Sequence, residues 1–260
     1  MKSIAERHNF ILEKLERKGF VSVVELAKDL DVSLPTIRKD LEALENKNLL
    51  VRSHGSASPV KPQVRDTNIN IKAKKNKEEK TAIAKEAQKL ICEEDAIILA
   101  SGSTVTAFAE ILEPIDILNV VTPSLGIALI VNDKDNINVM VLGGKMYKNS
   151  LSVRGEYAAA GLKNISCSKL FIGCDGIDIQ TGITCATTEE ASLTNVMMQA
   201  AEKTIILADS TKFGRRGFGK ICKLDDIDII ITDDGITQEM KDHLEETGVQ
   251  IIIAKTARKK

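Results

Sequence analysis

The sequence predicts an α/β protein of two unequal units: an N-terminal winged helix-turn-helix module and a larger α/β domain with a mostly parallel sheet. Three observations support this division. The 260 residues exceed one typical domain of about 100 to 200 residues. Helical periodicity with capping signals fills the first part, and short apolar runs alternate with helical segments in the rest. We expect domains at 1–57 and 81–260, joined by a linker at 58–80.

Composition excludes several classes of protein. Hydrophobic residues make up 43% of the chain and charged residues 28%, which supports a folded core and excludes disorder over most of the length. No apolar run approaches the roughly 20 residues of a membrane helix. The first residues lack an apolar signal core, so we expect a cytoplasmic protein without a membrane partner. An aromatic content of 3% argues against stacking platforms for single-stranded nucleic acid.

The cysteines and glycines indicate neither a metal nor a cofactor. Five cysteines contain no CxxC pair and only three histidines are present, so free thiols are favoured over the alternatives of a metal site or a disulfide framework. The glycine-rich segment 214–219 matches neither GxGxxG nor the P-loop pattern. We interpret it as a basic surface loop and expect no cofactor.

Positive charge is concentrated in the front of the chain. Residues 1–56 carry 10 basic and 9 acidic groups, residues 57–80 carry 7 and 3, and residues 81–260 carry 19 and 25. The first 80 residues are therefore at +5 and the remainder at −6. This asymmetry is consistent with a polyanionic partner at the front end, and equally with a solvated lysine-rich linker.

Three helices are predicted in the first unit. The first carries an apolar stripe that ends before Gly19, formed by Ile4, His8, Ile11, Leu12 and Leu15. We expect His8 to be a packed core histidine because no acid–base partner is identifiable. Ser22 and Glu25 form a capping box that starts the second helix. Ser33 caps the third, with Pro35 in its first turn and Ile37, Leu41 and Leu44 facing inward.

The N-terminal end of the third helix presents residues suited to a DNA groove: Leu34, Pro35, Thr36, Arg38 and Lys39. The second helix of a helix-turn-helix motif lies in the major groove, where an arginine reads guanine and neighbouring cations hold phosphates. We expect Arg38 to read a base and Lys39 to hold phosphate. The stretch 49–55, with Arg52 and His54, predicts a wing. A three-helix unit without DNA contacts would bury the same apolar stripes, and amphipathic spacing alone does not exclude it.

The amino-acid sequence of this segment resembles that of a known protein family. Residues 7–57, including Leu30-Asp31-Val32-Ser33, Thr36-Ile37-Arg38-Lys39-Asp40-Leu41 and Arg52-Ser53-His54-Gly55, closely resemble the DNA-binding domain of DeoR-type (DeoR/GlpR family) bacterial transcriptional regulators. Asn48 and Ser56 stand where that family often has glycine. The resemblance implies double-stranded operator DNA as the partner, contacted by Ser33, Leu34, Pro35, Thr36, Arg38, Lys39, Arg52 and His54.

Seven strand-like runs predict the sheet of the second unit: 96–100, 119–122, 139–142, 169–173, 204–208, 227–232 and 249–253. Parallel α/β sheets bind ligands beyond the carboxyl ends of their strands. Ser101-Gly102-Ser103-Thr104 follows the first run and offers hydroxyls and a helix N-terminus to an anion, although an ordinary Ser/Thr helix cap is the alternative. Later strand ends supply the other candidate effector-binding residues: Thr122, Ser124, Gly143, Gly144, Asp175, Thr184, Glu190 and Lys212.

The order of these motifs is similar to that in the sensor domain of the same DeoR family. The resemblance implies a fold related to ribose-5-phosphate isomerases, a phosphorylated sugar or related metabolite as effector, and a phosphate held by Gly102 to Thr104. The sequence differs from the family at Ala100, Pro123 and the pair Thr194-Asn195, so the effector identity stays open. Loss of a basic pair at 194–195 leaves Lys212 as the candidate that neutralises phosphate.

Two functions follow from these observations. The first is a transcriptional repressor of a carbohydrate operon, acting as a homodimer or homotetramer because one helix-turn-helix contacts few base pairs. The second is a sugar-phosphate isomerase fused to a DNA-binding module, with Asp175 or Asp178 as the base. The Lys-Gly-Gly-Gly run associated with those isomerases is absent from the sequence, and fold similarity does not establish chemistry. We therefore expect a regulator and no enzymatic activity.

Overall fold

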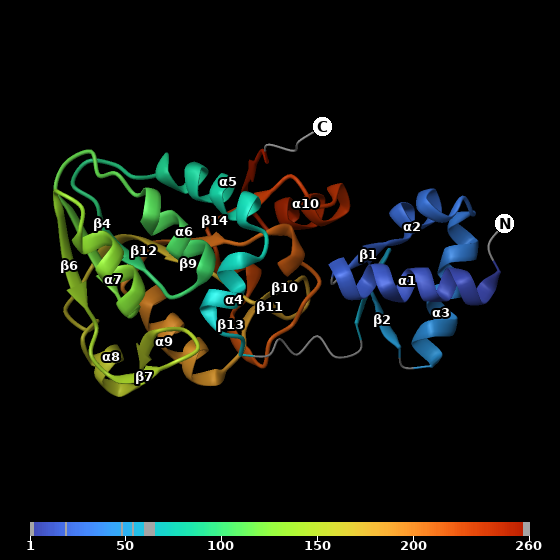
Figure 1. The fold of residues 1–260 in the computed structure, drawn as a ribbon, viewed down its shortest axis with the longest axis horizontal. Coiled ribbons are helices and arrows are strands. Elements are labelled where there is room, and N and C mark those ends of the chain that lie inside the picture. Colours follow the sequence, from blue (N-terminus) through green and yellow to red (C-terminus); the bar gives the residue numbers. More distant parts are fainter. Residues whose placement is uncertain (1–2, 19, 48, 54, 60–65, 257–260) are drawn as a thin grey trace.

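The computed structural model describes residues 3–18, 20–47, 49–53, 55–59 and 66–256. Figure 1 shows a small N-terminal lobe beside a larger lobe in which strands are covered by helices on both sides. The predicted wing residue His54, together with Gly19 and Asn48, lies outside the described residues. No helix within the described ranges is long and apolar enough to cross a membrane.

The N-terminal lobe has the order expected for a winged helix-turn-helix: α1 (Ile4–Lys18), β1 (Val21–Ser22), α2 (Val23–Leu30), α3 (Leu34–Asn46), β2 (Leu50–Ser53) and β3 (Ser56–Pro59). The three strands pair antiparallel in the order β1-β3-β2 within the described part of this lobe. Its core contains Ile11, Leu15, Ile37, Leu41 and Leu44, each at most 2% exposed. The helical stripes predicted from the sequence therefore meet in one core.

Local capping explains where the helices begin. The Ser33 hydroxyl accepts the Thr36 amide at 3.4 Å and Pro35 lies in the first turn of α3, as expected. Ser22 accepts the Glu25 amide at 3.1 Å, which confirms half of the predicted capping box. The Glu25 carboxylate turns away to pair with Lys14 and Lys18, because two ammonium groups of α1 lie within reach. Ile4 is 62% exposed, so the expected stripe on α1 is wrong at its first position.

Seven parallel strands form the sheet of the larger lobe within residues 66–256, in the order β15-β14-β12-β9-β4-β5-β6. They are β4 (Ala96–Leu99), β5 (Leu118–Thr122), β6 (Ile137–Val141), β9 (Cys167–Ile172), β12 (Ala201–Leu207), β14 (Ile229–Asp233) and β15 (Gln250–Ala254). The seven predicted apolar runs coincide with these strands. Since all seven run the same way, their carboxyl ends share one edge of the sheet.

The two faces of the sheet bury separate apolar clusters. Ile97 and Leu99 pack with α5 (Lys77–Gln88), α6 (Ser103–Ile111) and α7 (Leu125–Asn132). Ile98 points to the other face, which contains residues of α8 (Glu156–Ala160), α9 (Thr188–Gln199) and α10 (Gln238–Glu246). This alternation along β4 is what a strand buried on both faces requires.

Two smaller sheets of the larger lobe were not predicted. Strands β10 (Gly176–Asp178), β11 (Gly182–Cys185) and β13 (Gly219–Cys222) form one antiparallel sheet, and β7 (Lys145–Tyr147) pairs with β8 (Ser152–Arg154). The expected linker at 58–80 contains the short helix α4 (Ile69–Lys74) and the start of α5, in agreement with the helix expected to begin within this segment.

The glycine-rich loop after β12 is packed, contrary to the expectation of a simple surface loop. Phe213 is 2% exposed, and the Gly214 amide donates to the Ile177 carbonyl at 2.8 Å. The Arg216 guanidinium lies 3.1 Å from the Asp178 carboxylate. The loop therefore closes the β10–β11 hairpin, and its positive charge at Arg216 is already paired.

Candidate functional site

The N-terminal end of α3 exposes the residues predicted to contact DNA. Ser33, Leu34, Pro35, Arg38 and Lys39 are exposed, with Leu34 at 39%, and Thr36 is half-buried because its hydroxyl lies 2.9 Å from that of Ser33. Ile37 and Asp40 point inward on the same helix. The turn that precedes α3 thus directs one short polar and basic segment outward.

Arg38 and Arg52 border a shallow groove between α3 and the wing. Glu45 holds Arg52 in place, because its carboxylate accepts hydrogen bonds from the Arg52 amide and from the Arg52 side-chain Nε, each at 2.8 Å. These contacts hold the pKa of Glu45 below its ordinary value. Gln180, from the turn between β10 and β11, also borders the groove. The hydrogen bonds from Arg52 to the Glu45 carboxylate, which position Arg52 beside Arg38, were not predicted from the sequence.

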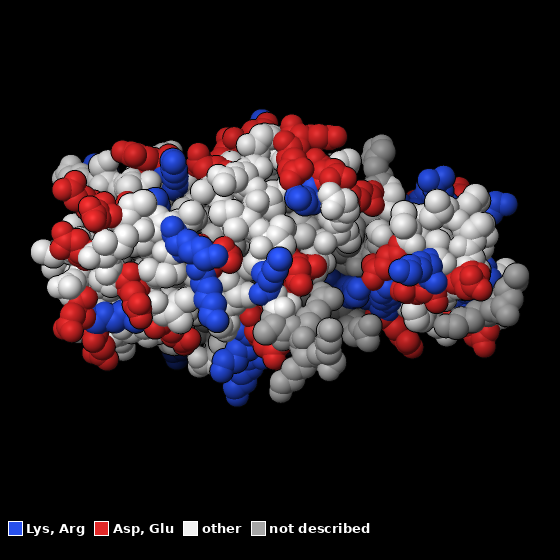
Figure 2. Space-filling view, turned by 90° about the horizontal axis from the view of Figure 1, so that it is seen from above, with Lys and Arg blue, Asp and Glu red and all other residues white. Residues whose placement is uncertain are grey.

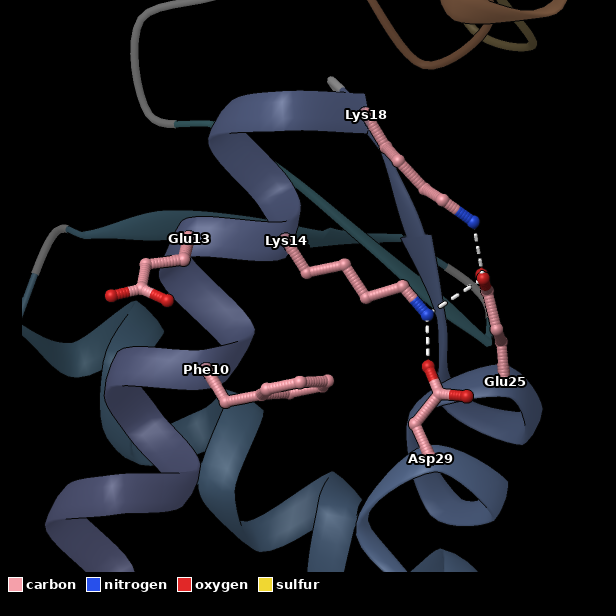
Figure 3. A pocket seen from close by; sticks show the side chains of 6 residues that line it. All are labelled: Phe10, Glu13, Lys14, Lys18, Glu25 and Asp29. Atoms are coloured by element: carbon pink, nitrogen blue, oxygen red, sulfur yellow. Dashed lines mark hydrogen bonds and ion pairs between the residues drawn. The ribbon is translucent and has the colours of Figure 1, made fainter.

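A second groove on this lobe lies between α1 and α2 and is lined by Phe10, Glu13, Lys14, Lys18, Glu25 and Asp29 (Figure 3). The Lys14 ammonium contacts Asp29 and lies 2.7 Å from Glu25. Burial disfavours the Lys14 charge, but hydrogen bonds to Asp29 and Glu25 outweigh it and raise the pKa of Lys14. This cation is neutralised within the lobe, where it ties α1 to α2, so we do not include it among the DNA-contacting groups.

His8 has a partner that the sequence did not reveal. Its Nε2 lies 3.3 Å from the Asp40 carboxylate, which also accepts two hydrogen bonds from Arg7, at 2.7 and 2.9 Å. The prediction of a partnerless core histidine is therefore wrong in that respect. The acid comes from α3, more than 30 positions away, and only folding brings it to α1.

At the carboxyl edge of the large sheet, the structure brings several predicted residues to one narrow pocket, which we call the strand-end pocket. Its lining is Ala100, Ser101, Pro123, Ser152, Val153, Arg154, Ile172, Gly173, Glu190, Leu193, Thr194 and Met197. Gly102, next to Ser101, is the N-cap of α6, and no side chain within the described residues caps that helix. Its φ of 151° suits glycine, and its Cα packs toward Gly173. The first amides of α6 are therefore available to an anion beside the pocket.

Arg154 supplies the positive charge of this pocket, and sequence reasoning missed it. Only 3% exposed, it donates to Thr187 Oγ1 at 2.6 Å and to Glu190 Oε2 at 3.0 Å, while its guanidinium lies 4.5 Å from the centroid of the Tyr147 ring. Lys212, the cation expected there, is not among the lining residues. No motif marks Arg154 in the sequence, because it lies in β8, a short strand of the small β7–β8 hairpin.

Glu190 and Asp175 provide carboxylates near this arginine. Burial raises the pKa of Glu190, and the neighbouring Arg154 charge opposes the shift only in part. Asp175 accepts the Ala186 amide at 3.1 Å and the Lys72 ammonium at 2.7 Å. Lys72 belongs to α4, so the linker contributes a charged group to this edge of the sheet.

Other predicted effector residues have their polar groups occupied by the fold. The Thr122 hydroxyl donates to the Leu99 carbonyl at 2.7 Å and accepts the Ser124 amide at 3.1 Å. Ser124 caps α7. The Thr184 hydroxyl donates to Gly176 and accepts the Gly217 amide at 2.8 Å. All three side chains are at most 1% exposed, and none lines the strand-end pocket.

The remaining predicted effector-binding residues, Thr104, Gly143 and Gly144, do not line the strand-end pocket. Thr104 lies in the first turn of α6 and is 5% exposed. Gly143 is exposed, and Gly144, with φ of 142°, passes so close to the Arg154 carbonyl that an added Cβ would lie 2.8 Å from it. Gly144 thereby lets the β7–β8 hairpin, which carries Arg154, close on the sheet. The five cysteines, all within the described residues, are free thiols.

The chain matches two family models. One, described as a DeoR-like helix-turn-helix domain, covers residues 7–63, and the other, described as the DeoR C terminal sensor domain, covers residues 75–234. The solved structures to which the chain is similar include ribose 5 phosphate isomerase A from Neisseria gonorrhoeae, with 19% identity, 52% of each chain covered and a TM-score of 0.38.

Curated relatives match over nearly the whole length. They include the HTH-type transcriptional regulator GolR of Listeria innocua, with 34% identity over 96% of this chain and 98% of the relative. The HTH-type transcriptional repressor GlcR of Bacillus subtilis is 32% identical over 95% of each. The lactose phosphotransferase system repressor of Lactococcus lactis is 33% identical over 94% and 96%. The printed names of these relatives are those of transcriptional regulators, so the family supports the regulator and not the isomerase-like enzyme. The chain belongs to the DeoR family of helix-turn-helix transcriptional regulators.

Proposed function

We propose that this DeoR-family regulator represses a carbohydrate-utilisation operon and that a phosphorylated sugar bound at the strand-end pocket controls its hold on the operator. One observation carries the proposal: the buried Arg154 guanidinium lines the same pocket as Ser101, which directly precedes the uncapped N-terminus of α6 at the carboxyl edge of a parallel sheet. Both groups favour an anion, and neither is needed to fill an apolar core.

The DNA-contacting role rests on the exposed end of α3 and on the wing. Arg38 is the candidate base reader, Lys39 and Arg52 hold phosphates, and the short residues around Ser33 allow close approach of the backbone. On the face viewed in Figure 2, basic and acidic side chains are intermixed over the larger lobe, so no continuous basic field draws DNA to that side.

The phosphorylated effector rests on complementary groups. A phosphate at Ser101, Gly102, Ser103 and Thr104 receives amide and hydroxyl hydrogen bonds, and Arg154 balances its charge. The carboxylates of Glu190 and Asp175 accept hydrogen bonds from sugar hydroxyls. The other predicted residues do not line the pocket, so this proposal gives them no contact with the effector: Thr122, Ser124, Gly143, Gly144, Thr184 and Lys212. Relatives described as a lactose phosphotransferase system repressor and a putative aga operon transcriptional repressor support a sugar-related effector.

The active species is a homodimer or homotetramer. A single recognition helix reads too few base pairs for useful affinity, whereas a two-fold dimer presents two such helices to half-sites about one helical turn apart. A sedimentation experiment that finds only monomer at the concentration where DNA is bound would contradict this part of the proposal.

The proposal is tested in two steps. Selection of bound fragments from a random DNA library gives the operator sequence, and a two-fold repeated motif is expected. Thermal unfolding is then followed with phosphorylated pentoses and hexoses and with the same sugars lacking phosphate, because a ligand of the native state raises its stability. We expect a shift with phosphorylated sugars only, and release of the selected DNA by the same compounds. Enrichment of no DNA sequence, or equal shifts with unphosphorylated sugars, would overturn the proposal.

A further inference from the structure

Strand β6 ends the large sheet, and its outer edge faces no other strand within residues 66–256. A strand at a sheet edge presents unpaired amide and carbonyl groups, which proteins usually protect with charges, proline or a covering segment. The β6 sequence, Ile137-Asn138-Val139-Met140-Val141, contains neither a charged residue nor proline. Apart from the ladder with β5, no hydrogen bond from a described residue reaches the backbone of this strand. The edge is therefore open to strand addition.

Exposed apolar side chains accompany this edge. Met140 and Val141 of β6 are 45% and 43% exposed. The neighbouring elements add Leu129 of α7 at 72%, Met146 of β7 at 46% and Tyr157 of α8 at 83%. Figure 1 shows β6 and these elements at the end of the larger lobe that lies away from the N-terminal lobe. An apolar patch of this kind on the surface of a folded chain marks an interaction site.

The side chains of β6 are complementary to those of an antiparallel copy of the same strand. Ile137 and Val139 pack against the apolar cluster that includes α7, and Val141 follows on the same face. In an antiparallel pair centred on Val139, Ile137 of one chain lies beside Val141 of the other, and Val139 lies beside its own copy. β-Branched side chains pack well beside one another on a pleated sheet. Such a pair would cover the exposed Val141 of each chain.

Charge at the two ends of β6 favours the antiparallel arrangement. The turn before the strand carries Asp133, Lys134 and Asp135, of which the two acids are exposed, and Lys145 is exposed just after the strand. Antiparallel pairing brings the acidic end of each strand to the basic end of the other, whereas parallel pairing brings like charges together. A two-fold axis also closes an antiparallel pair of identical strands, so the edge is satisfied by one further copy.

We propose that a second copy of this chain pairs with β6 in this antiparallel arrangement and joins the two large sheets into one. The inference rests on the homo-oligomer of the proposed function and assigns one of its surfaces. Because the N-terminal lobe lies at the other end of the chain (Figure 1), the two DNA-binding lobes of such a pair point away from each other. Contact with adjacent half-sites therefore depends on a different surface, and β6 links two units that bind DNA separately.

Lysine on β6 tests the pairing, because a charge on an edge strand opposes strand addition. Met140→Lys and Val141→Lys should each halve the mass of the full-chain oligomer measured by sedimentation equilibrium. Phe218→Lys is the matched control, because Phe218 is 65% exposed and belongs to the glycine-rich loop after β12. This control should keep the original mass, and circular dichroism establishes that each variant is folded. An unchanged mass in either folded β6 variant, or a monomeric original chain, overturns the proposal.

Hydrogen exchange tests the same surface in the original chain. Exchange of residues 137–141 should slow as the protein concentration rises through the association range, because pairing occupies the free amides of the edge. Residues 167–172 of β9 are paired on both sides and should not respond. If the mass rises with concentration while exchange of residues 137–141 stays constant, another surface joins the copies and the proposal is overturned.

Cross-linking tests the register. Directly opposite residues of an antiparallel pair have Cβ atoms about 4.5–5.5 Å apart. In a Cys92→Ser background, which removes the exposed cysteine, Val139→Cys should form a covalent dimer under mild oxidation faster than Phe218→Cys. Equal rates would overturn the antiparallel register centred on Val139.

Operator binding separates this inference from the proposed function. Met140→Lys and Val141→Lys should select the same DNA sequence as the original chain and bind a single operator with unchanged affinity. Loss of operator affinity in these folded variants would overturn the assignment of half-site contact to a different surface. If the β6 variants keep the original mass, the inference fails and the regulator stands. If the original chain pairs through β6 but selects no DNA, the proposed function fails and the inference stands.

Discussion

Arg7 and Asp40 form a buried bidentate ion pair that joins α1 to α3, with Nε and Nη2 of the arginine 2.7 and 2.9 Å from the two carboxylate oxygens. The hydrogen bond and charge of Asp40 raise the pKa of Arg7 despite the cost of burial. Asp40 directly follows Lys39 on α3. Its inward position therefore fixes the rotation of the helix and with it the outward direction of Arg38 and Lys39.

Asp40→Asn should strongly destabilise the N-terminal lobe, because it removes the carboxylate charge that accepts two hydrogen bonds from the buried Arg7 guanidinium. Removing one partner of a buried pair typically costs about 3–5 kcal/mol. Urea unfolding followed by circular dichroism measures the loss, and hydrogen exchange of residues 4–18 assigns it to this lobe. The double variant Arg7→Met with Asp40→Leu should recover much of the stability. A single variant as stable as the original chain would contradict the structural role of the pair.

Arg38→Ala should weaken binding to the selected operator and relax the preference at one base position. A bidentate arginine–guanine contact contributes about 1–3 kcal/mol of discrimination. Lys39→Ala, the adjacent exposed cation, should weaken binding to all sequences and reduce the salt dependence by about one charge. Competition binding with operator and random duplexes distinguishes the two. A uniform loss in Arg38→Ala would make that residue a phosphate contact.

Arg154→Gln should abolish the response to phosphorylated sugars while operator binding persists. Hydrogen bonds to charged groups contribute about 1.5–3 kcal/mol, so effector affinity should fall by roughly 10- to 150-fold. Arg216→Gln is the matched control, since that arginine is also paired with a carboxylate but lies outside the strand-end pocket. Thermal unfolding confirms that both variants fold. If Arg154→Gln responds to the sugar like the control, Arg154 does not bind the phosphate of the effector.

Thr104→Val should keep operator binding and lose most of the effector response, because the hydroxyl at the first turn of α6 is replaced by a methyl group of similar size. Thr106→Val, two residues further along, tests the specificity: the Thr106 hydroxyl bonds to the Gly102 carbonyl at 2.9 Å within the helix. Titration of the protein–operator complex with the effector measures both. Equal responses of the two variants would exclude the Thr104 hydroxyl from the sensing contact.

Asp95→Asn should lower stability without changing the effector response. Asp95 precedes β4 at the amino edge of the sheet and binds the Lys169 ammonium at 2.6 Å. Burial raises the pKa of Asp95, but hydrogen bonds from Lys169, Ser168 and the Cys92 amide outweigh it, so the pKa lies below 3.8. The carboxylate therefore stabilises the fold above its unfolded pKa, and this contribution is lost as pH falls through the lower folded value.

The expected pH profile follows from that sign. Between neutral pH and about pH 5, the free energy of unfolding of Asp95→Asn should be lower than that of the original chain by a constant amount. The difference should shrink as pH falls below the ordinary aspartate value. Chemical unfolding at several pH values measures it. A difference that grows toward low pH would contradict the lowered pKa of Asp95.

Much of the fold was predictable because its signals are local. Apolar runs mark all seven strands of the large sheet, and Ser33 with Pro35 marks the start of α3. A strand end directed attention to Ser101 and an expected helix start to Glu190, and both residues line the strand-end pocket. Local sequence, however, does not show whether a hydroxyl at a strand end is already used. Thr122 and Thr184 bond to backbone groups of neighbouring segments, which only the folded chain brings together.

The charged groups of the site were harder to predict for the same reason. Arg154 reaches the pocket from a small hairpin, and Lys72 reaches Asp175 across 103 positions of sequence. Arg154 is a single basic residue in a segment without a recognisable motif, and Lys72 is one of several lysines in residues 72–80. Their partners depend on how the hairpin and α4 pack against the sheet. This packing leaves no periodic pattern in the sequence.

The uniform direction of the seven strands has a consequence for how such a regulator diversifies. Asp95 and Lys169 brace one rim of the sheet, and Ser101, Arg154 and Glu190 occupy the other. Ala100 and Pro123, where the sequence departs from the family, line the pocket on the second rim and lie away from this brace. Gene duplicates of this architecture can thus change their ligand by single substitutions at this rim, without a loss of fold stability at the other rim.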